Sequence, residues 1–407
     1  MPLRRHLSSV VVGLICVAWP MAAGAQYADE IPILSGPGFF ATSVARGPFV
    51  LIPTLTLAEE YNDNIFLDNT RRRSDFITHA SPGARLVMES PGYRISAGYF
   101  FTAEKYAQQT QLDSLFHTQA LFADTRWLVT PLVTLTLGDI LTASDSTNAA
   151  SAEGIATGRT RSLSNTVSPG LAWQFTPRTS FQLLASYTLE RFDGVNARDS
   201  DSYRLGGNLG YDLTRRLRGT VGYEGAYLDI QGQVGTTTHT PRAGLTYQIT
   251  PTLTGSVNGG PTFVSGSEDR VSGSGTASLV QRLEFGSASL TYDRSIAVAG
   301  GLGGPTENQS VSAALRVTTI ARGLTLEFSP SYTTATSVGS QSIDVRAVRL
   351  VLRAAYQITP WMGLLTSYNF FRQRTDTTTT AAGLTVNDVD QNRVFLGLQF
   401  GFPIKRD

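Results

Sequence analysis

The stretch Phe181–Glu190, which reads FQLLASYTLE, sets the pattern that decides the fold. Its odd positions carry apolar or aromatic side chains, and its even positions are mostly polar. Because successive side chains of a strand point to opposite sides, this alternation predicts a β-strand with one apolar face. The same pattern recurs at Val311–Thr318, Leu324–Ser329 and Arg393–Phe402. The sequence therefore predicts an all-β chain.

Strands with one apolar face occur in soluble β-sandwiches and in membrane β-barrels. In a membrane barrel the apolar face meets lipid and the polar face lines a lumen. The predicted strands run ~10 to 14 residues, which fits a tilted bilayer span better than a soluble sheet. Aromatic residues also gather at segment ends, as in interfacial girdles: Tyr93, Trp127, Trp173, Phe175, Tyr247, Tyr356, Trp361, Phe400 and Phe402. We therefore predict a transmembrane antiparallel up-and-down β-barrel.

Short connections rich in Pro or Gly alternate with longer ones, and they set the strand count. The short ones lie at residues 90–92, 130–131, 176–177, 214–216, 250–251, 285–286, 321–323 and 359–360. These eight turns join sixteen strands, and a first strand near 49–61 and a last strand near 390–402 complete a barrel of about 18 strands. A 16-strand barrel is the alternative, because Leu253–Val264 and Arg270–Glu284 alternate least regularly.

Several prolines fall inside the predicted strands. A proline cannot donate to the strand ladder, and a closed barrel has no free edge to accommodate it, so we expect local β-bulges at these positions. They are Pro53, Pro82, Pro169, Pro241, Pro261 and Pro330.

The first 25 residues have the pattern of an export signal. Arg4 and Arg5 precede an apolar stretch over residues 7–19, and Ala23-Gly24-Ala25 has the form of a cleavage site. We expect a signal peptide over 1–25, with an uncleaved anchor as the alternative. A periplasmic N-terminal segment over 26–47, an outer-membrane β-barrel over 48–402 and a periplasmic C-terminal tail over 403–407 complete the predicted organisation, which places the chain in the Gram-negative outer membrane.

The composition excludes several classes of function. The 407 residues include 33 Lys+Arg and 32 Asp+Glu, so the formal net charge of +1 argues against a nucleic-acid partner. The single cysteine, Cys16, excludes a disulfide framework and a cysteine metal site. Ser114 and His117 lie too close along one strand to form a catalytic triad without further groups. We therefore expect neither an enzyme nor a bound cofactor.

One motif points to a known family. The run Glu60, Tyr61, Asn62, Asp63, Asn64, Ile65 and Phe66 is followed by residues 74–77 (SDFI) and 81–83 (SPG). This opening hairpin resembles that of the beta-barrel porin 2 family, outer-membrane proteins often associated with exopolysaccharide gene clusters. The resemblance implies an outer-membrane channel or accessory protein for exopolysaccharide export, with polysaccharide export proteins or an acidic glycan as partners. Barrels of this kind commonly end on an aromatic that the barrel assembly machinery reads, whereas here Phe402 is followed by residues 403–407.

Charged residues on the polar faces are the candidate functional set. Alternation points these side chains into the lumen: Arg85, Arg94, Glu104, Glu190, Arg204, Arg218, Glu224, Arg242, Arg316, Glu327, Arg349, Arg353 and Arg393. They form either a selectivity surface, because rings of like charge set ion preference, or a structural network that braces the wall. Arg349 and Arg353 share one strand face and predict a positive ladder for anions, unless acids such as Glu327 neutralise them.

The first long loop offers two further hypotheses. Asn62, Asp63, Asn64, Asp68 and Asn69 present oxygen atoms that suit Ca²⁺, although turn formation explains the same residue types. The neighbouring Arg71, Arg72 and Arg73 match lipopolysaccharide phosphates, and an ordinary solvated loop explains them equally well. Outer-membrane lipid and lipopolysaccharide are therefore expected partners. The leading function is polysaccharide export, and the alternatives are a general small-solute porin and a structural barrel with a blocked lumen.

Overall fold

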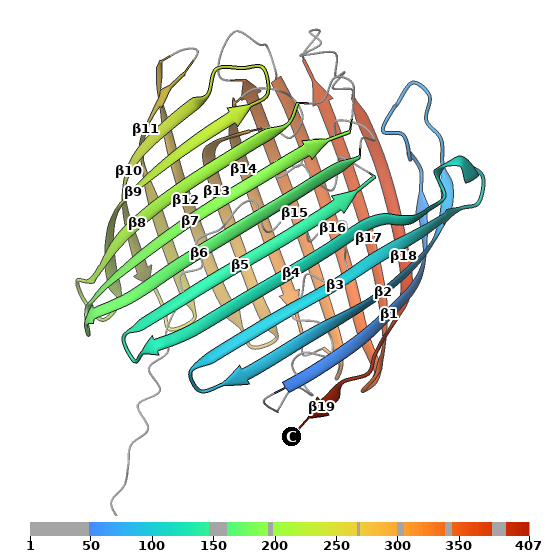
Figure 1. The fold of residues 1–407 in the computed structure, drawn as a ribbon, viewed down its shortest axis with the longest axis horizontal. Helices are drawn as coiled ribbons and strands as arrows, with labels where there is room; N and C mark the ends of the chain where they lie inside the picture. Colours follow the sequence, from blue (N-terminus) through green and yellow to red (C-terminus); the bar gives the residue numbers. More distant parts are fainter. Residues whose placement is uncertain are drawn as a thin grey trace, which may run out of the picture.

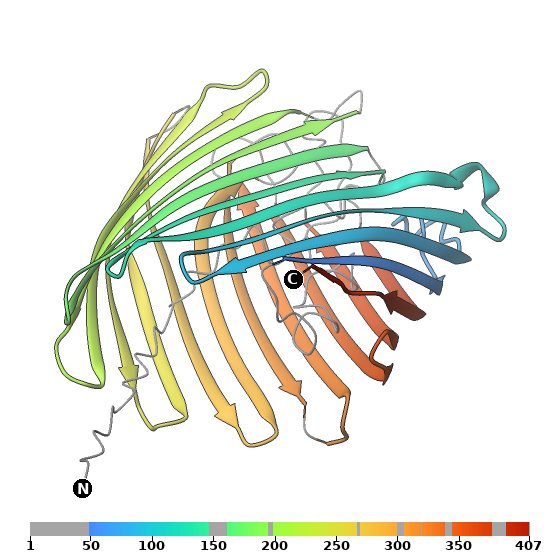
Figure 2. The same ribbon diagram turned by 60° about the horizontal axis from the view of Figure 1, so that its bottom comes forward.

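The strands form one closed antiparallel sheet (Figure 1). The computed structural model describes residues 49–145, 161–193, 198–266, 269–298, 305–318, 320–337, 344–376 and 388–406. Each strand pairs with its neighbours in sequence, and β1 pairs with both β2 and β18, so the sheet closes on itself (Figure 2). The fold is an antiparallel up-and-down β-barrel.

The long strands span 12 to 17 residues each. The first nine are β1 (Phe49–Asn62), β2 (Asp75–Ser90), β3 (Tyr93–Tyr106), β4 (Ser114–Thr130), β5 (Val133–Ser144), β6 (Ser162–Thr176), β7 (Thr179–Phe192), β8 (Ser200–Asp212) and β9 (Leu217–Ile230). The next nine are β10 (Thr236–Gln248), β11 (Leu253–Ser265), β12 (Arg270–Leu283), β13 (Gly286–Val298), β14 (Pro305–Val317), β15 (Leu324–Ser337), β16 (Asp344–Thr359), β17 (Met362–Thr375) and β18 (Val389–Gly401). A 3-10 turn, η1 (Thr110–Leu112), lies in the connection between β3 and β4.

The predicted count of 18 long strands is confirmed, and both doubtful segments are strands, β11 and β12. A further strand of three residues, β19 (Ile404–Arg406), continues the direction of β18 and pairs with the start of β1. Residues that were expected in a tail after Phe402 are thus paired with the barrel wall. The C-terminus lies at the end of the barrel where the short turns gather (Figure 1).

Threonine hydroxyls shape five of the short turns. Thr176 Oγ1 accepts hydrogen bonds from the backbone N–H groups of Arg178 and Thr179, and Thr214 and Thr250 make the same pair of contacts in their own turns. Thr130 and Thr359 each accept one such bond. A side-chain acceptor two or three residues before a backbone donor is a local turn device. The turns therefore form where the sequence predicts them.

The prolines inside the strands do not create bulges, so that expectation was wrong. Pro241 pairs with Tyr223 on β9, whereas its ladder with β11 is interrupted between His239 and Ala243 without any change of register. Each of the other five likewise pairs on one side and interrupts the ladder on the other. A missing N–H affects only one neighbour, so a single broken ladder step absorbs each proline.

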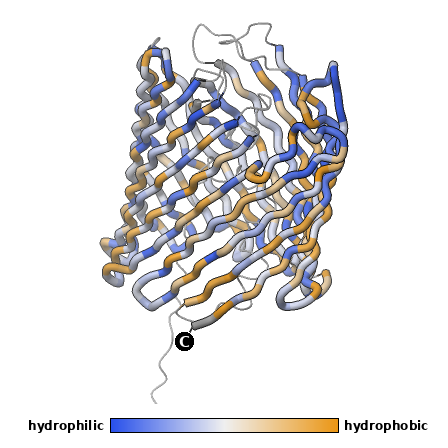
Figure 3. The backbone as a smooth tube through the Cα atoms, turned by 45° about the vertical axis from the view of Figure 1, so that its right-hand side comes forward, coloured by the Kyte–Doolittle hydropathy of each residue, from blue (hydrophilic) through white to orange (hydrophobic). Residues whose placement is uncertain are grey.

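The outer face is an apolar belt bounded by aromatic residues. Hydrophobic and hydrophilic positions alternate along the strands in Figure 3. Near the short turns the outward aromatics include Trp127, Trp173 and Trp361, and near the long loops they include Tyr203 and Tyr227, all exposed. Between these two rings, leucine and valine dominate the exposed large side chains. No helix of the described ranges is long and apolar enough to cross a membrane.

Two expectations fall outside the described residues. They are the signal peptide over 1–25 and the segment over 26–47.

Candidate functional site

The candidate site is the inner wall of the barrel. The structure places the following charged residues on the face opposite the exposed apolar belt: Arg85, Arg94, Glu104, Glu190, Arg204, Arg218, Glu224, Arg242, Arg316, Glu327, Arg349, Arg353 and Arg393. They do not form one cluster. Contacts between neighbouring strands divide them into braced pairs, a buried group near the long loops, and arginines near the short turns.

Braced pairs take up part of the set. Glu224 lies 3.2 Å from Arg242 and 3.8 Å from Arg204, so one carboxylate links three adjacent strands. Glu327 lies 3.7 Å from Arg353. Arg353, one of the two arginines of the predicted positive ladder, therefore has an acidic partner. These residues fit the alternative interpretation, in which the charged side chains form a structural network that braces the wall.

Arginines gather on the inner face near the short turns. Six of them lie within five residues of the short-turn end of their strand, and we call them the arginine band: Arg85, Arg94, Arg126, Arg218, Arg282 and Arg316. Within the same distance the described strands place three inward carboxylates, Glu89, Asp212 and Glu327. The wall at this end therefore carries an excess of positive charge.

Most of the arginines near the short turns are exposed on the inner face. Arg94, Arg126, Arg282 and Arg316 are exposed although they face inward, and among the described residues none of the four forms an ion pair. Arg94 and Arg126 lie directly opposite each other on β3 and β4. Arg85 is half-buried, donates from Nε to Ser96 Oγ at 3.1 Å, and lies 5.8 Å from the centroid of the Phe122 ring. These guanidinium groups remain charged at any working pH and can pair with carboxylates or phosphates.

A buried charged cluster lies on the inner wall near the long loops. His79 on β2 lies between two carboxylates, with Nε2 3.5 Å from Glu60 and Nδ1 3.3 Å from Glu104. His117 Nδ1 lies 3.4 Å from the second oxygen of Glu104, and Arg393 holds Glu60 through two hydrogen bonds of 2.9 and 3.0 Å. Glu60, His79 and His117 are buried, the Glu104 side chain is 8% exposed, and Arg393 is half-buried. The cluster links β18, β1, β2, β3 and β4 from the inside.

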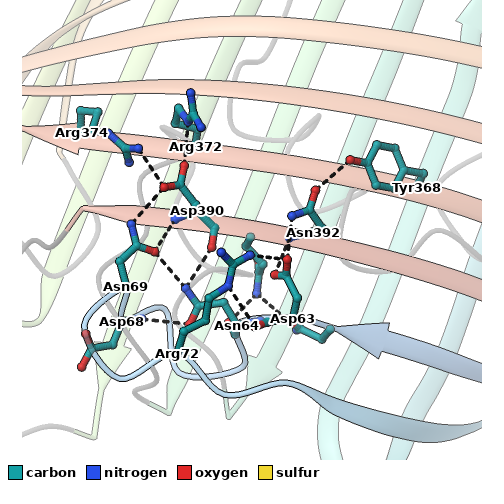
Figure 4. Close-up of polar contacts among 12 residues, drawn as sticks. Asp63, Asn64, Asp68, Asn69, Arg72, Tyr368, Arg372, Arg374, Asp390 and Asn392 are labelled. Atoms are coloured by element: carbon teal, nitrogen blue, oxygen red, sulfur yellow. Dashed lines mark hydrogen bonds and ion pairs between the residues drawn. The ribbon is translucent and has the colours of Figure 1, made fainter.

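The first long loop fastens the last strand to the first, as Figure 4 shows. Asn64 is fully buried; its Nδ2 donates to the Asp390 carbonyl at 2.9 Å, and its Oδ1 accepts from the Asp68 N–H at 3.1 Å. Asp63 accepts from the backbone and side chain of Asn392 at 2.7 and 2.6 Å. Asn69 donates to Asp390 at 3.1 Å. The oxygens considered for Ca²⁺ are thus used in hydrogen bonds that order the loop and hold β18.

The loop arginines are partly engaged within the loop. Arg72 pairs with Asp63, and Arg71 lies 3.1 Å from Asp68. The Thr70 hydroxyl and N–H, together with Arg71, lower the pKa of Asp68 to about 2. Arg73 lies 6.0 Å from the Phe66 ring centroid. A role of these arginines toward lipopolysaccharide stays a prediction.

Two members of the arginine band were missed in the sequence. Arg126 alternates with Phe122 and Asp124 on the inward phase of β4, and Arg282 shares its phase with Ser278, so strict alternation would have found both. His117 could not be found in this way. The register of β3 with β4 shifts between Thr102 and Glu104 of β3, and extra residues of β4 lie opposite this step. The His117 side chain therefore points inward.

Comparisons with known proteins find only distant structural similarity. No family model matches the sequence, and no curated protein matches it, so the resemblance at residues 60–66 gains no support. Among solved structures, OccAB4 of Acinetobacter baumannii is similar at 11% identity and a TM-score of 0.47, over 88% of this chain and 99% of that one. A BenF-like porin of Pseudomonas fluorescens Pf-5 matches at 10% identity and 0.47, over 86% and 99%. OpdO of Pseudomonas aeruginosa matches at 12% and 0.46, over 87% and 97%. Similarity at this level carries no conclusion about the function of this chain.

Proposed function

We propose that this chain is an outer-membrane channel for small hydrophilic solutes and that it favours anions. The apolar outer belt between two aromatic rings suits a bilayer, and the closed sheet leaves no unpaired strand edge in lipid. The inner wall is polar, and most of its arginines near the short turns are exposed. A barrel with these two faces can hold an aqueous path.

The arginine band carries the preference for anions. Six inward arginines oppose three carboxylates, and within the described residues only Arg218 of the six forms an ion pair, with Asp212. Rings of like charge set the ion preference of a pore. A solute that carries a carboxylate or phosphate could pair transiently with adjacent guanidinium groups such as Arg94 and Arg126.

Export of an acidic polysaccharide, which the motif at residues 60–66 implied, would use the same charge. Nothing in the described residues favours a polymer over a small solute, and the inner wall explains passage of small anions directly. The proposal is therefore limited to small solutes.

Ion selectivity in planar bilayers tests the proposal. The barrel carrying Arg94→Gln and Arg126→Gln together should show a lower chloride-to-potassium permeability ratio, measured from the reversal potential in a KCl gradient. The matched control is Arg372→Gln with Arg374→Gln, which removes the same charge from the outer rim. An unchanged ratio in a conducting Arg94/Arg126 variant would refute the anion preference. A folded native barrel that never conducts would point instead to a blocked lumen.

A further inference from the structure

One register row of the inner wall near the short turns places two arginines on either side of a serine. Arg282 on β12 pairs with Ser287 on β13, and Ser287 pairs in turn with Arg316 on β14. Ser287 has the same phase on β13 as Asp293, which accepts a hydrogen bond at 2.7 Å from Thr276 on the inward face of β12. Neighbouring strands lie ~4.8 Å apart, so the two arginine Cα atoms are separated by about 10 Å. We call these three residues the Arg–Ser–Arg row.

No other described residue uses the polar side-chain groups of this row. Arg282 and Arg316 are exposed, and within the described ranges neither guanidinium group forms an ion pair or a hydrogen bond. The same holds for the hydroxyl of Ser287, which is half-buried. The row therefore presents two guanidinium groups and a hydroxyl to the lumen.

The carboxylate that comes next to the row has a partner of its own. Glu327 on β15 lies opposite Arg316, but its ion pair is with Arg353, at 3.7 Å. The two adjoining short turns add Glu284 and Arg322, which are both exposed and offset each other. The row and its surroundings therefore hold four arginines and two glutamates, which is a local excess of positive charge.

The other arginine pair of this end, Arg94 and Arg126, has carboxylates beside it. Glu89 on β2 lies directly opposite Arg94, and Asp124 precedes Arg126 by two residues on the same face of β4. Both carboxylates are exposed. They compete with an incoming anion for the guanidinium groups, so the Arg–Ser–Arg row is the stronger anion site of the two.

We propose that the Arg–Ser–Arg row binds a phosphate group at the mouth of the lumen. Guanidinium groups pair with phosphate through two parallel hydrogen bonds, and two of them match a group that carries ~1.5 to 2 negative charges near neutral pH. Phosphate has enough oxygen atoms to accept from both arginines and from the Ser287 hydroxyl, whereas a single guanidinium group already occupies both oxygens of a carboxylate. The inference rests on the proposed function for the aqueous lumen and adds the class of anion that is held there.

Calorimetric titration of inorganic phosphate into the folded barrel in detergent micelles tests the site. The native barrel should bind phosphate at neutral pH and low ionic strength. Arg282→Gln with Arg316→Gln should lower the affinity by about tenfold or more, because charge-assisted hydrogen bonds from both arginines are lost. Ser287→Ala should lower it severalfold, and acetate should bind the native barrel much more weakly than phosphate does.

Two further double variants provide the controls. Arg215→Gln with Arg216→Gln removes the same charge from the turn between β8 and β9, at the same end of the barrel, and should change the phosphate affinity far less. Arg282→Lys with Arg316→Lys keeps the charge but loses the planar guanidinium groups, so its affinity should lie between those of the native barrel and the glutamine variant. Heat-modifiable migration establishes that each variant is folded.

Several outcomes would overturn the proposal: a folded native barrel that binds no phosphate, unchanged affinity after substitution of Arg282 and Arg316, an equal loss in the Arg215 and Arg216 variant, or acetate that binds as tightly as phosphate. Conductance in planar bilayers is recorded on the same samples. An anion-selective barrel without phosphate binding would refute only the site, whereas a phosphate-binding barrel that never conducts would refute only the channel.

Discussion

At the scale of single residues, buried polar contacts hold the two ends of the sheet together. Arg393 on β18 and Glu60 on β1 form a two-point ion pair, and the Glu60 side chain is only 4% exposed. Asn64 and Asp63 add hydrogen bonds to Asp390 and Asn392 on the same strand. The residues that resembled a family motif therefore hold β1 and the first long loop against β18, where the sheet closes.

Removing Arg393 should weaken this seam. Arg393→Gln leaves the buried Glu60 carboxylate with His79 and the Asn62 amide nearby but without its guanidinium partner, and breaking one side of a buried pair typically costs ~3 to 5 kcal/mol. Guanidinium unfolding of the reconstituted barrel, followed by tryptophan fluorescence, should show a lower midpoint. The double variant Glu60→Gln with Arg393→Gln removes both charges and should recover much of the loss. A single variant as stable as the native barrel would show that the pair does not support closure.

At the scale of elements, each strand has one face for lipid and one for the lumen, so two adjacent residues point into opposite environments. On β14, Val311 is 44% exposed on the outer face, whereas Ser312 faces inward between Thr291 and Ser331. Both lie near the middle of the strand. The short turns, five of which are ordered by threonine hydroxyls, keep the strands in the register that maintains this division.

Arginine substitutions at these two adjacent positions should have unequal effects. Val311→Arg places a charge in the apolar belt, which costs ~2 to 4 kcal/mol near the bilayer midplane. Ser312→Arg places the same charge in the lumen and should cost much less. The measurement is the folded fraction in lipid vesicles, assayed by heat-modifiable migration. Equal loss in both variants would contradict the assignment of faces.

At the scale of the whole molecule, the two ends of the barrel differ. Short turns and the start of β1 lie at one end, and the long connections lie at the other (Figure 1). Barrels of the outer membrane place short turns in the periplasm and longer loops outside. The arginine band would then surround the periplasmic mouth, and the buried cluster of Glu60, His79 and Glu104 would lie toward the outside.

Labelling of intact cells tests this orientation. In a background without Cys16, Gln111→Cys in the connection between β3 and β4 should react with a membrane-impermeant maleimide, and Arg215→Cys in the turn between β8 and β9 should not. Both positions are exposed, so access depends on the membrane rather than on burial. Permeabilised cells provide the control in which both should react. The reverse pattern in intact cells would invert the barrel.

The sequence by itself determined the strands, their number and their faces. Alternation and turn chemistry are local properties, so Phe181–Glu190 and the Thr-Pro turns could be interpreted without knowledge of any partner strand. The inward phase of Arg94 and Arg353 followed from the same local rule.

Only the tertiary structure decided which side chains meet, because contacts across strands depend on register around the closed sheet. Register joined Glu327 to Arg353 and left Arg94 opposite Arg126. A register shift turned His117 toward Glu104, and the prolines broke single ladder steps rather than forming bulges. The position of Ser287 between Arg282 and Arg316 likewise emerged from the pairing of β13 with β12 and β14. These contacts join residues far apart in the chain, and no local pattern encodes them.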